Sequence, residues 1–204
     1  MSETYISLEQ QGAVATVWLE RPEVHNAFNA DLIRQLKDCF VALNQRDDVR
    51  VVVLAGRGKS FSAGADLNWM KAAGAASEAE NQADAQQLAD MLYALATLKQ
   101  PTIARVQGAA MGGGMGLAAT CDICIAGDKA VFATSEVRLG LAPSTISPYV
   151  IRAIGERQAQ RYFLTAERIS AAKAAEIGLA HEVVGMEALD AKVEEIVAAL
   201  LLGG

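Results

Sequence analysis

The chain has 204 residues, of which 52% are hydrophobic and 21% are charged, and its formal net charge is -6. This length fits one domain better than two, and the composition is too apolar and too lightly charged for a disordered chain. The acidic balance, with no run of Lys or Arg, argues against a nucleic-acid partner, because contacts to phosphates dominate that affinity.

Targeting segments and cysteines indicate the compartment. The first residues, MSETYISLEQQG, lack a basic region followed by an apolar one, so we expect no secretory signal or transit peptide. No apolar run reaches the length of a membrane span, and we expect no membrane partner. Three cysteines, Cys39, Cys121 and Cys124, cannot all pair, which favours reduced thiols in the cytoplasm. We interpret the CxxC of Cys121 and Cys124 as two small buried hydrophobic residues rather than a metal or redox site.

Strands and helices alternate in the first part of the chain. Two short strands are predicted at residues 5–10 and 13–19, followed by a polar, Pro-containing loop. Residues 31–44 carry apolar side chains at helical spacing, with Asn29 as the predicted N-cap. Residues 49–55, VRVVVLA, form a nearly continuous β-branched run, which is typical of a strand covered on both faces.

The second part of the chain begins with a Gly/Ser loop, GRGKSFSAGADLNWM, and a helical segment at residues 77–98. A buried strand at 102–106 leads into a glycine cluster and a helix of small residues, QGAAMGGGMGLAATCD. Short strands follow at 123–126 and 131–132, and the chain from about residue 147 is predicted to be mostly helical. The pattern predicts an α/β architecture with a helical C-terminal part.

Two Gly-rich loops each follow a predicted buried strand, at residues 60–66 (SFSAGAD) and 112–114 (GGG). If the loops converge, two backbone N–H groups could point at one oxygen, with the positive end of a helix behind the second loop. Such an arrangement stabilises an enolate or oxyanion. A phosphate-binding loop is excluded because no GK[ST] follows the glycines. A dinucleotide-binding site is excluded because no ordered GxGxxG follows the first strand. A tight turn with close helix packing is the alternative interpretation.

Five motifs in chain order resemble the crotonase (enoyl-CoA hydratase/isomerase) superfamily. They are RPEVHNAFN, FSAGADL, QGAAMGGGMGLAATCDICIAG, SEVRLGLAP and GERQAQRYFLTAERISAAKAAEIGLAHEVV, and they cover most of the chain. The resemblance implies a crotonase (ClpP-like) spiral of repeated ββα units in a single domain, residues 1–204. Residues 1–146 would be the spiral core, and residues 147–204 a helical part that is shorter than usual for the family. The resemblance also implies a homotrimer or a dimer of trimers.

The resemblance further implies an acyl-CoA substrate and assigns residues to it. The oxyanion donors would be the N–H groups of Ala65 and Gly113, and the catalytic carboxylate would be Glu136. From residue position alone, Glu136 could instead be a solvated glutamate at a strand end. Coenzyme A is part of the substrate, so we expect no separate cofactor and no metal. The residues implied in CoA or substrate binding are Glu23, Val24, His25, Ala63, Ala65, Asp66, Leu67, Asn68 and Gly113; Asp66 could also cap the next helix or pair with a cation.

One position departs from the family pattern. Hydratases of this family usually hold a water between two glutamates, and the upstream one would stand at Gly116. One carboxylate is enough to move a proton between carbons, whereas hydration is easier with two. Hydroxyls at Ser144, Thr145 and Ser147 replace glycines of the family pattern. The apolar neighbours of Glu136, which are Phe132, Val137, Leu139 and Leu141, predict a raised pKa for its carboxyl.

We therefore expect an enzyme, an enoyl-CoA hydratase that adds water across the 2,3 double bond through a stabilised enolate. The stretch SEVRLGLAP to GERQAQRYFLTAE most resembles bacterial methylglutaconyl-CoA hydratases, so a branched substrate such as 3-methylglutaconyl-CoA is the expected acyl-CoA. Two alternatives stay open. One is a delta3-delta2-enoyl-CoA isomerase that uses a single glutamate, and the other is a non-catalytic acyl-CoA-binding protein.

Overall fold

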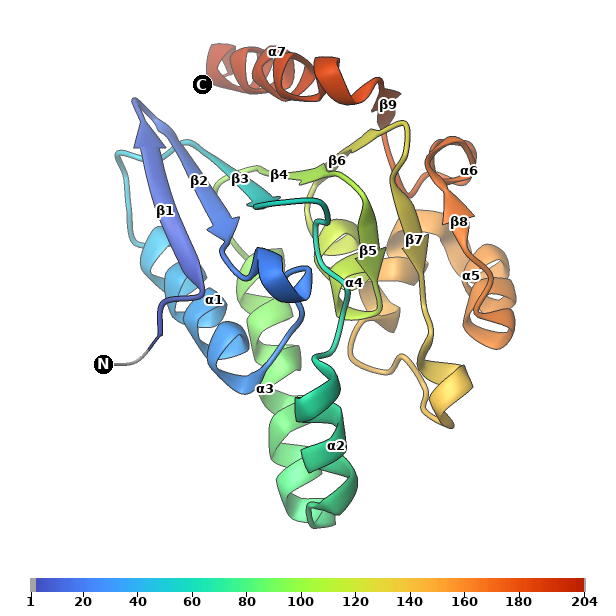
Figure 1. The fold of residues 1–204 in the computed structure, drawn as a ribbon. Coiled ribbons are helices and arrows are strands. Elements are labelled where there is room, and N and C mark those ends of the chain that lie inside the picture. The colour runs from blue at the N-terminus through green and yellow to red at the C-terminus, as the bar shows by residue number, and fades with distance from the viewer. Residues whose placement is uncertain (1–2, 204) are drawn as a thin grey trace.

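A computed structural model describes residues 3–203 and contains two sheets (Figure 1). The larger sheet has six strands in the order β1-β2-β3-β4-β6-β9, with β1 antiparallel to β2 and the other neighbours parallel. The smaller sheet has the order β5-β7-β8. The strands of the larger sheet are β1 (Ile6–Gln11), β2 (Val14–Leu19), β3 (Val51–Gly56), β4 (Thr102–Val106), β6 (Ile123–Gly127) and β9 (Glu182–Val184). Those of the smaller sheet are β5 (Ala109–Met111), β7 (Val131–Ala133) and β8 (Ile169–Ser170).

Helices cover both faces of the larger sheet, which explains the continuous apolar run of β3. Val51 and Val53 pack with Leu189 and Val193 of α7 (Leu189–Leu202). Val52 and Leu54 belong to the cluster on the opposite face. That face is covered by α1 (Ala30–Leu43), α3 (Glu78–Ala96) and α4 (Gly113–Thr120) (Figure 1).

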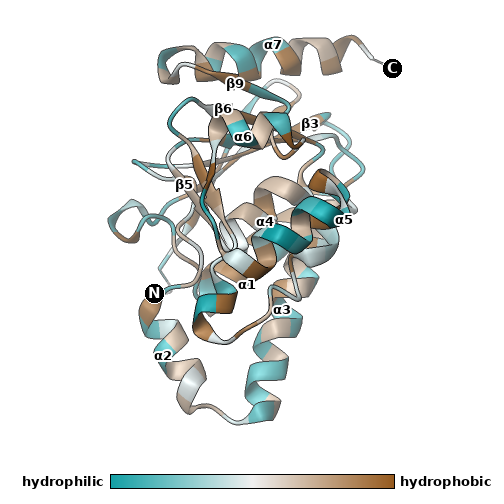
Figure 2. Ribbon diagram, turned by 90° about the vertical axis from the view of Figure 1, so that its right-hand side faces the viewer, coloured by the Kyte–Doolittle hydropathy of each residue, from teal (hydrophilic) through white to brown (hydrophobic). Residues whose placement is uncertain are grey.

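Local capping fixes where the helices begin. The Asn29 side chain accepts a hydrogen bond of 2.8 Å from the Leu32 N–H, which confirms the predicted N-cap of α1. At α3, Ser77 and Glu80 form a reciprocal capping box. The first half of α3 is hydrophilic and exposed, and its apolar contacts begin near Met91 (Figure 2).

One predicted boundary is wrong. The Gly/Ser loop was expected to run through residue 70, but α2 (Leu67–Ala75) begins inside it, because the Asp66 side chain accepts a hydrogen bond of 2.8 Å from Asn68 N–H. The C-terminal part is mostly helical, as expected, with α5 (Ser147–Thr165) and α6 (Ala171–Glu176). However, β8 and β9 also lie there, and each completes an edge of a sheet.

The CxxC cysteines are buried, as the sequence indicates. Cys121 is 6% exposed and Cys124 is 1% exposed. Burial raises the pKa of the Cys124 thiol to about 12 and that of the Cys121 thiol further. Both thiols are therefore protonated at neutral pH and pack as small apolar groups.

One apolar cluster connects elements from both sheets, reaching from Ala15 in β2 to Ala180 near the C-terminal end. The division of the chain at residue 146 stays a prediction. Within residues 3–203, the helices are all too short or too polar to cross a bilayer.

Candidate active site

The two Gly-rich loops lie against each other. Ser62 N–H donates to Ala109 O at 2.9 Å, and Met111 N–H donates to Ser62 O at 2.9 Å. Gly64 has a φ of 86°, and a Cβ at that position would lie 2.8 Å from Met111 O. Only glycine accepts both this backbone conformation and this approach. The SFSAGAD loop is thereby held at the start of the GGG segment.

Phe28 connects the two loops, and it is 1% exposed. Its N–H donates to Gly64 O at 2.6 Å, and its carbonyl accepts from Asp66 N–H at 2.8 Å. Its ring covers Gly113, where a Cβ would lie 2.6 Å from ring atom Cε2. We did not select Phe28 from the sequence, although it lies inside the RPEVHNAFN motif.

This pairing leaves two backbone donors without a partner. Phe28 bonds to the residues on either side of Ala65, so the Ala65 N–H points away from Phe28. Gly113 is the first residue of α4, where N–H groups have no acceptor within the helix. Within residues 3–203, neither N–H donates a hydrogen bond to another group of the chain. Two free donors beside a helix N-terminus suit an oxygen on which negative charge develops.

Glu136 lies beside this pair of donors. It is the first residue of a short 3₁₀ helix (Glu136–Leu139) that follows β7. Its Oε1 lies 3.2 Å from the position that a Cβ on Gly112 would take. Its Oε2 is buried and has no hydrogen-bond partner within the described chain. The site therefore places a carboxylate next to the start of α4, with one oxygen free to accept a proton.

Burial raises the pKa of the Glu136 carboxyl, because desolvation disfavours the charged form. The predicted direction is confirmed, but part of the predicted cause is wrong. Leu139 and Leu141 are 55% and 57% exposed and do not enclose the carboxyl. The close approach to Gly112 contributes to its burial instead. A raised pKa suits a group that both accepts and returns a proton.

The raised pKa predicts a pH-dependent gain in stability on replacing Glu136 with glutamine. The native protein holds the Glu136 proton to a higher pH than the unfolded chain, whose glutamate titrates near 4.5. The stability that this adds is present below that pH and is lost as pH rises through the raised native pKa. Glu136→Gln cannot ionise, so its melting temperature relative to that of the unaltered chain should increase as pH rises from about 4.5 through the raised native pKa. Thermal denaturation at several pH values measures this, and a difference that does not change with pH would contradict it.

The two segments implied in CoA binding are neighbours at the surface. Glu23, Val24 and His25 are exposed, and so is Ala63. Ala63 N–H donates to His25 O at 2.9 Å, which joins the first segment to the second. His25 Nδ1 lies 3.0 Å from Ser60 Oγ, so its ring is oriented by the second loop. The structure thus brings these two segments together at the surface.

The second segment continues into α2. Asp66 caps that helix, and its carboxylate also pairs with Arg21 at 3.1 Å. The hydrogen bond from Asn68 N–H lowers the pKa of Asp66 below its ordinary value, and the hydrogen bond from Arg21 lowers it to a smaller extent. Both structural interpretations of Asp66 are therefore correct. Leu67 is 74% exposed and Asn68 is also exposed, so both side chains are available to a ligand.

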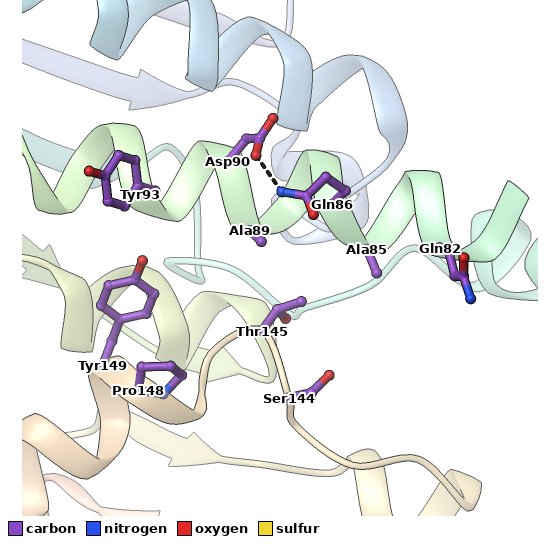
Figure 3. Close-up of a pocket in the computed structure, with 10 residues that line it drawn as sticks. All are labelled: Gln82, Ala85, Gln86, Ala89, Asp90, Tyr93, Ser144, Thr145, Pro148 and Tyr149. Atoms are coloured by element: carbon purple, nitrogen blue, oxygen red, sulfur yellow. Dashed lines mark hydrogen bonds between the residues drawn. The ribbon is translucent and has the colours of Figure 1, made fainter. Parts of the chain in front are cut away.

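Gly116, where the family resemblance implies a second glutamate, is buried about one turn after Gly112, and its N–H donates to Gly112 O at 3.0 Å. A groove of about 680 Å³ lies between α3 and the start of α5 (Figure 3). Tyr93 from α3 and Tyr149 from α5 face each other across the groove, with Thr145 on the same side as Tyr149 (Figure 3).

Hydroxyls dominate the polar surface of this groove. Ser144 and Thr145 line it beside the two tyrosines. Asp90 is the one charged residue among those that line it, and its carboxylate accepts hydrogen bonds from Lys37 and Gln86 at 2.8 and 2.7 Å. Within residues 3–203, no three His, Cys, Asp or Glu side chains are placed to hold a metal ion.

The profile of the enoyl-CoA hydratase/isomerase family matches residues 9–203 of this chain. A crotonyl-CoA hydratase from Syntrophomonas wolfei is 35% identical over 206 residues, which cover 100% of this chain and 78% of the relative. The solved structure of an enoyl-CoA hydratase from Shewanella pealeana has a TM-score of 0.94 and 43% identity, covering 97% of this chain and 74% of that one. A 4-chlorobenzoyl coenzyme A dehalogenase from Arthrobacter is also 33% identical over 198 residues, covering 96% of this chain and 71% of the relative. Similarity alone therefore does not select the reaction, and the residues of the site must do so.

Proposed function

Since the chain belongs to the enoyl-CoA hydratase/isomerase family and has the crotonase fold, we propose that it adds water across the 2,3 double bond of an enoyl-CoA thioester. One observation carries the proposal. The Glu136 carboxyl lies against Gly112, next to the unpaired N–H of Gly113. An enolate mechanism needs a group that accepts a proton and, close to it in space, an N–H group that donates to the oxyanion.

The proposed reaction uses the two donors and one carboxylate. The thioester carbonyl oxygen accepts hydrogen bonds from the N–H groups of Ala65 and Gly113, which draws electrons away from the β-carbon. Water adds to the β-carbon while Glu136 takes one of its protons, and the electron pair of the double bond moves into the enolate. Glu136 then returns that proton to the α-carbon, and the carbonyl is restored. Proton and electrons balance without a second carboxylate.

We propose a branched acyl group, such as that of 3-methylglutaconyl-CoA, as the preferred substrate. The resemblance of the SEVRLGLAP to GERQAQRYFLTAE stretch supports this choice. The hydroxyls of Ser144, Thr145, Tyr93 and Tyr149 in the groove also support it, because hydroxyls can donate to a distal carboxylate. On the family resemblance alone, we also propose a homotrimer or hexamer, with no cofactor beyond the coenzyme A of the substrate.

The second candidate is the isomerisation of a 3-enoyl-CoA to a 2-enoyl-CoA. The glycine at position 116 favours it, because it leaves Glu136 as the one acidic side chain over this face of α4 in the described chain. Glu136 would remove a proton from the α-carbon, which gives a dienolate held by the same two N–H donors, and would return the proton to the γ-carbon. Both reactions share the donors and differ in whether water enters.

A substrate panel decides between these reactions. The purified chain is given crotonyl-CoA, 3-methylglutaconyl-CoA and an unbranched 3-enoyl-CoA, and products are separated by chromatography. We expect water to add to both 2-enoyl thioesters, and faster to the branched one. Migration of the 3-enoyl bond without any hydration would show that the hydratase proposal is wrong. Binding of CoA with no turnover of any thioester would support a non-catalytic acyl-CoA-binding protein.

A further inference from the structure

Ile146 occupies the space above Gly116. A Cβ built on Gly116 would overlap the Ile146 Cγ2 atom and would lie 2.9 Å from its Cβ. Ile146 is 1% exposed, so its side chain has no open space into which it could move. No side chain larger than that of glycine fits at position 116 while isoleucine stands at position 146. The two residues are therefore a matched pair.

This pair lies one helical turn from the carboxylate. Gly116 N–H donates to Gly112 O, so the two glycines lie about one turn apart at the start of α4, with a rise of about 6 Å over four residues. The Glu136 carboxyl stands over Gly112, and Ile146 stands over Gly116. An acidic side chain at position 116 would need the volume that Ile146 fills, about one helical turn from Gly112, against which the Glu136 carboxyl lies.

We propose that Ile146 determines the reaction specificity of this site, by filling the place of a second carboxylate with an apolar side chain. It closes the site to a water held between two carboxylates, so that Glu136 alone moves the proton. Ile146 thereby sets the balance between water addition and double-bond migration. This inference rests on the proposed function, because it concerns the same enolate.

The backbone fixes Ile146 independently of its side chain. Ser144 N–H donates to Ala142 O at 2.8 Å, and Ser147 N–H donates to Pro143 O at 2.9 Å, so the loop is held by main-chain bonds. Ile146 is the N-cap of α5 and makes no side-chain capping bond. Glycine is well tolerated at an N-cap. Ile146→Gly thus removes the apolar side chain while the turn keeps its bonds.

The first experiment tests the matched pair through stability. Gly116→Ala should lower the melting temperature, because the new Cβ overlaps Ile146. Adding Ile146→Gly should recover part of that loss, so that the two changes together cost less than their sum. The control adds Ile169→Ala, a truncation of an isoleucine buried to the same degree in β8, and should give no recovery. If the losses of melting temperature caused by Gly116→Ala and by Ile146→Gly simply added in the double variant, the two residues would not be a matched pair.

The second experiment tests the effect on the reaction. Ile146→Gly and the double variant Gly116→Glu, Ile146→Gly are assayed for crotonyl-CoA hydration and for migration of a 3-enoyl bond. The second carboxylate should raise the ratio of hydration to migration by about tenfold or more over Ile146→Gly alone. An unchanged ratio in a folded double variant would overturn the inference while the proposed function stands. If the unaltered chain turns over neither thioester, the proposed function is wrong, and so is the proposed effect of Ile146 on the reaction. The stability experiment still tests whether Gly116 and Ile146 are a matched pair.

Discussion

Replacing Glu136 with glutamine is expected to reduce thioester turnover by about 10²–10⁴-fold, the usual contribution of a positioned acid–base group. Glutamine keeps the size and the polar character of the side chain but accepts no proton at neutral pH. Because Oε2 of Glu136 has no hydrogen-bond partner among the described residues, the change breaks no hydrogen bond of that oxygen. We therefore expect CoA affinity to be retained. Steady-state kinetics and equilibrium binding of CoA measure the two effects separately.

The matched control is Glu156→Gln. Glu156 is an exposed glutamate of α5, and its replacement should leave turnover unchanged. If Glu136→Gln retained full activity, Glu136 would not be the base and the proposed mechanism would be wrong. Combined loss of activity, CoA binding and melting temperature would point to misfolding instead. That outcome would contradict the expectation that glutamine at position 136 leaves the fold intact.

Removing the Ala65 N–H is expected to reduce turnover by about 10²–10³-fold, as does the loss of one oxyanion donor in other enzymes. The change is a backbone ester, made by placing the α-hydroxy acid that corresponds to alanine at position 65. The Ala65 N–H donates to no other group within residues 3–203. Stability should therefore change little, while the carbonyl of the substrate loses one of its two donors.

The same ester at Ala63 is the control. It should lower the melting temperature and leave the rate nearly unchanged, which is the opposite of what we expect for the Ala65 ester. Ala63 N–H donates to His25 O, so the ester removes a hydrogen bond of the fold and should lower the melting temperature. It removes no donor from the proposed oxyanion hole, so the catalytic rate should change far less than in the Ala65 ester. Equal rates for the two esters would contradict the assignment of Ala65.

Features with a local cause could be predicted from the sequence. The β-branched run of β3 predicts a strand covered on both faces, and helices do cover both faces. Asn29 caps α1 as predicted, because an N-cap depends on residues two or three positions away. Asp66 illustrates the limit. Capping was one of its predicted roles, yet the start of α2 was placed inside a loop because the Gly/Ser content dominated the pattern.

Features that depend on distant neighbours could not be predicted in this way. Phe28 and Gly113 are far apart in the sequence, and nothing in the RPEVHNAFN loop says which residue its aromatic ring will cover. The relation between Gly116 and Ile146 is similar. The family resemblance implies a glutamate at position 116, but only the fold shows that Ile146 fills the space there.

The similarities to hydratases and to a dehalogenase give these contacts their importance. Proteins that act on different CoA thioesters share this fold, and a pair of backbone donors is consistent with many reactions of a thioester. In the proposed mechanism, the acidic side chains placed around the donors decide which bond changes. In this chain Glu136 stands at one end of that face of α4 and Ile146 at the other.

A crystal structure with bound butyryl-CoA tests the central claim most directly, because its saturated acyl group leaves the thioester unreacted. We predict that the thioester oxygen lies about 2.7–3.1 Å from both the Ala65 and the Gly113 nitrogen atoms. The α-carbon should then face the Glu136 carboxyl. A thioester carbonyl that contacts neither nitrogen, in a site with CoA bound, would contradict the proposed oxyanion hole and the mechanism that depends on it.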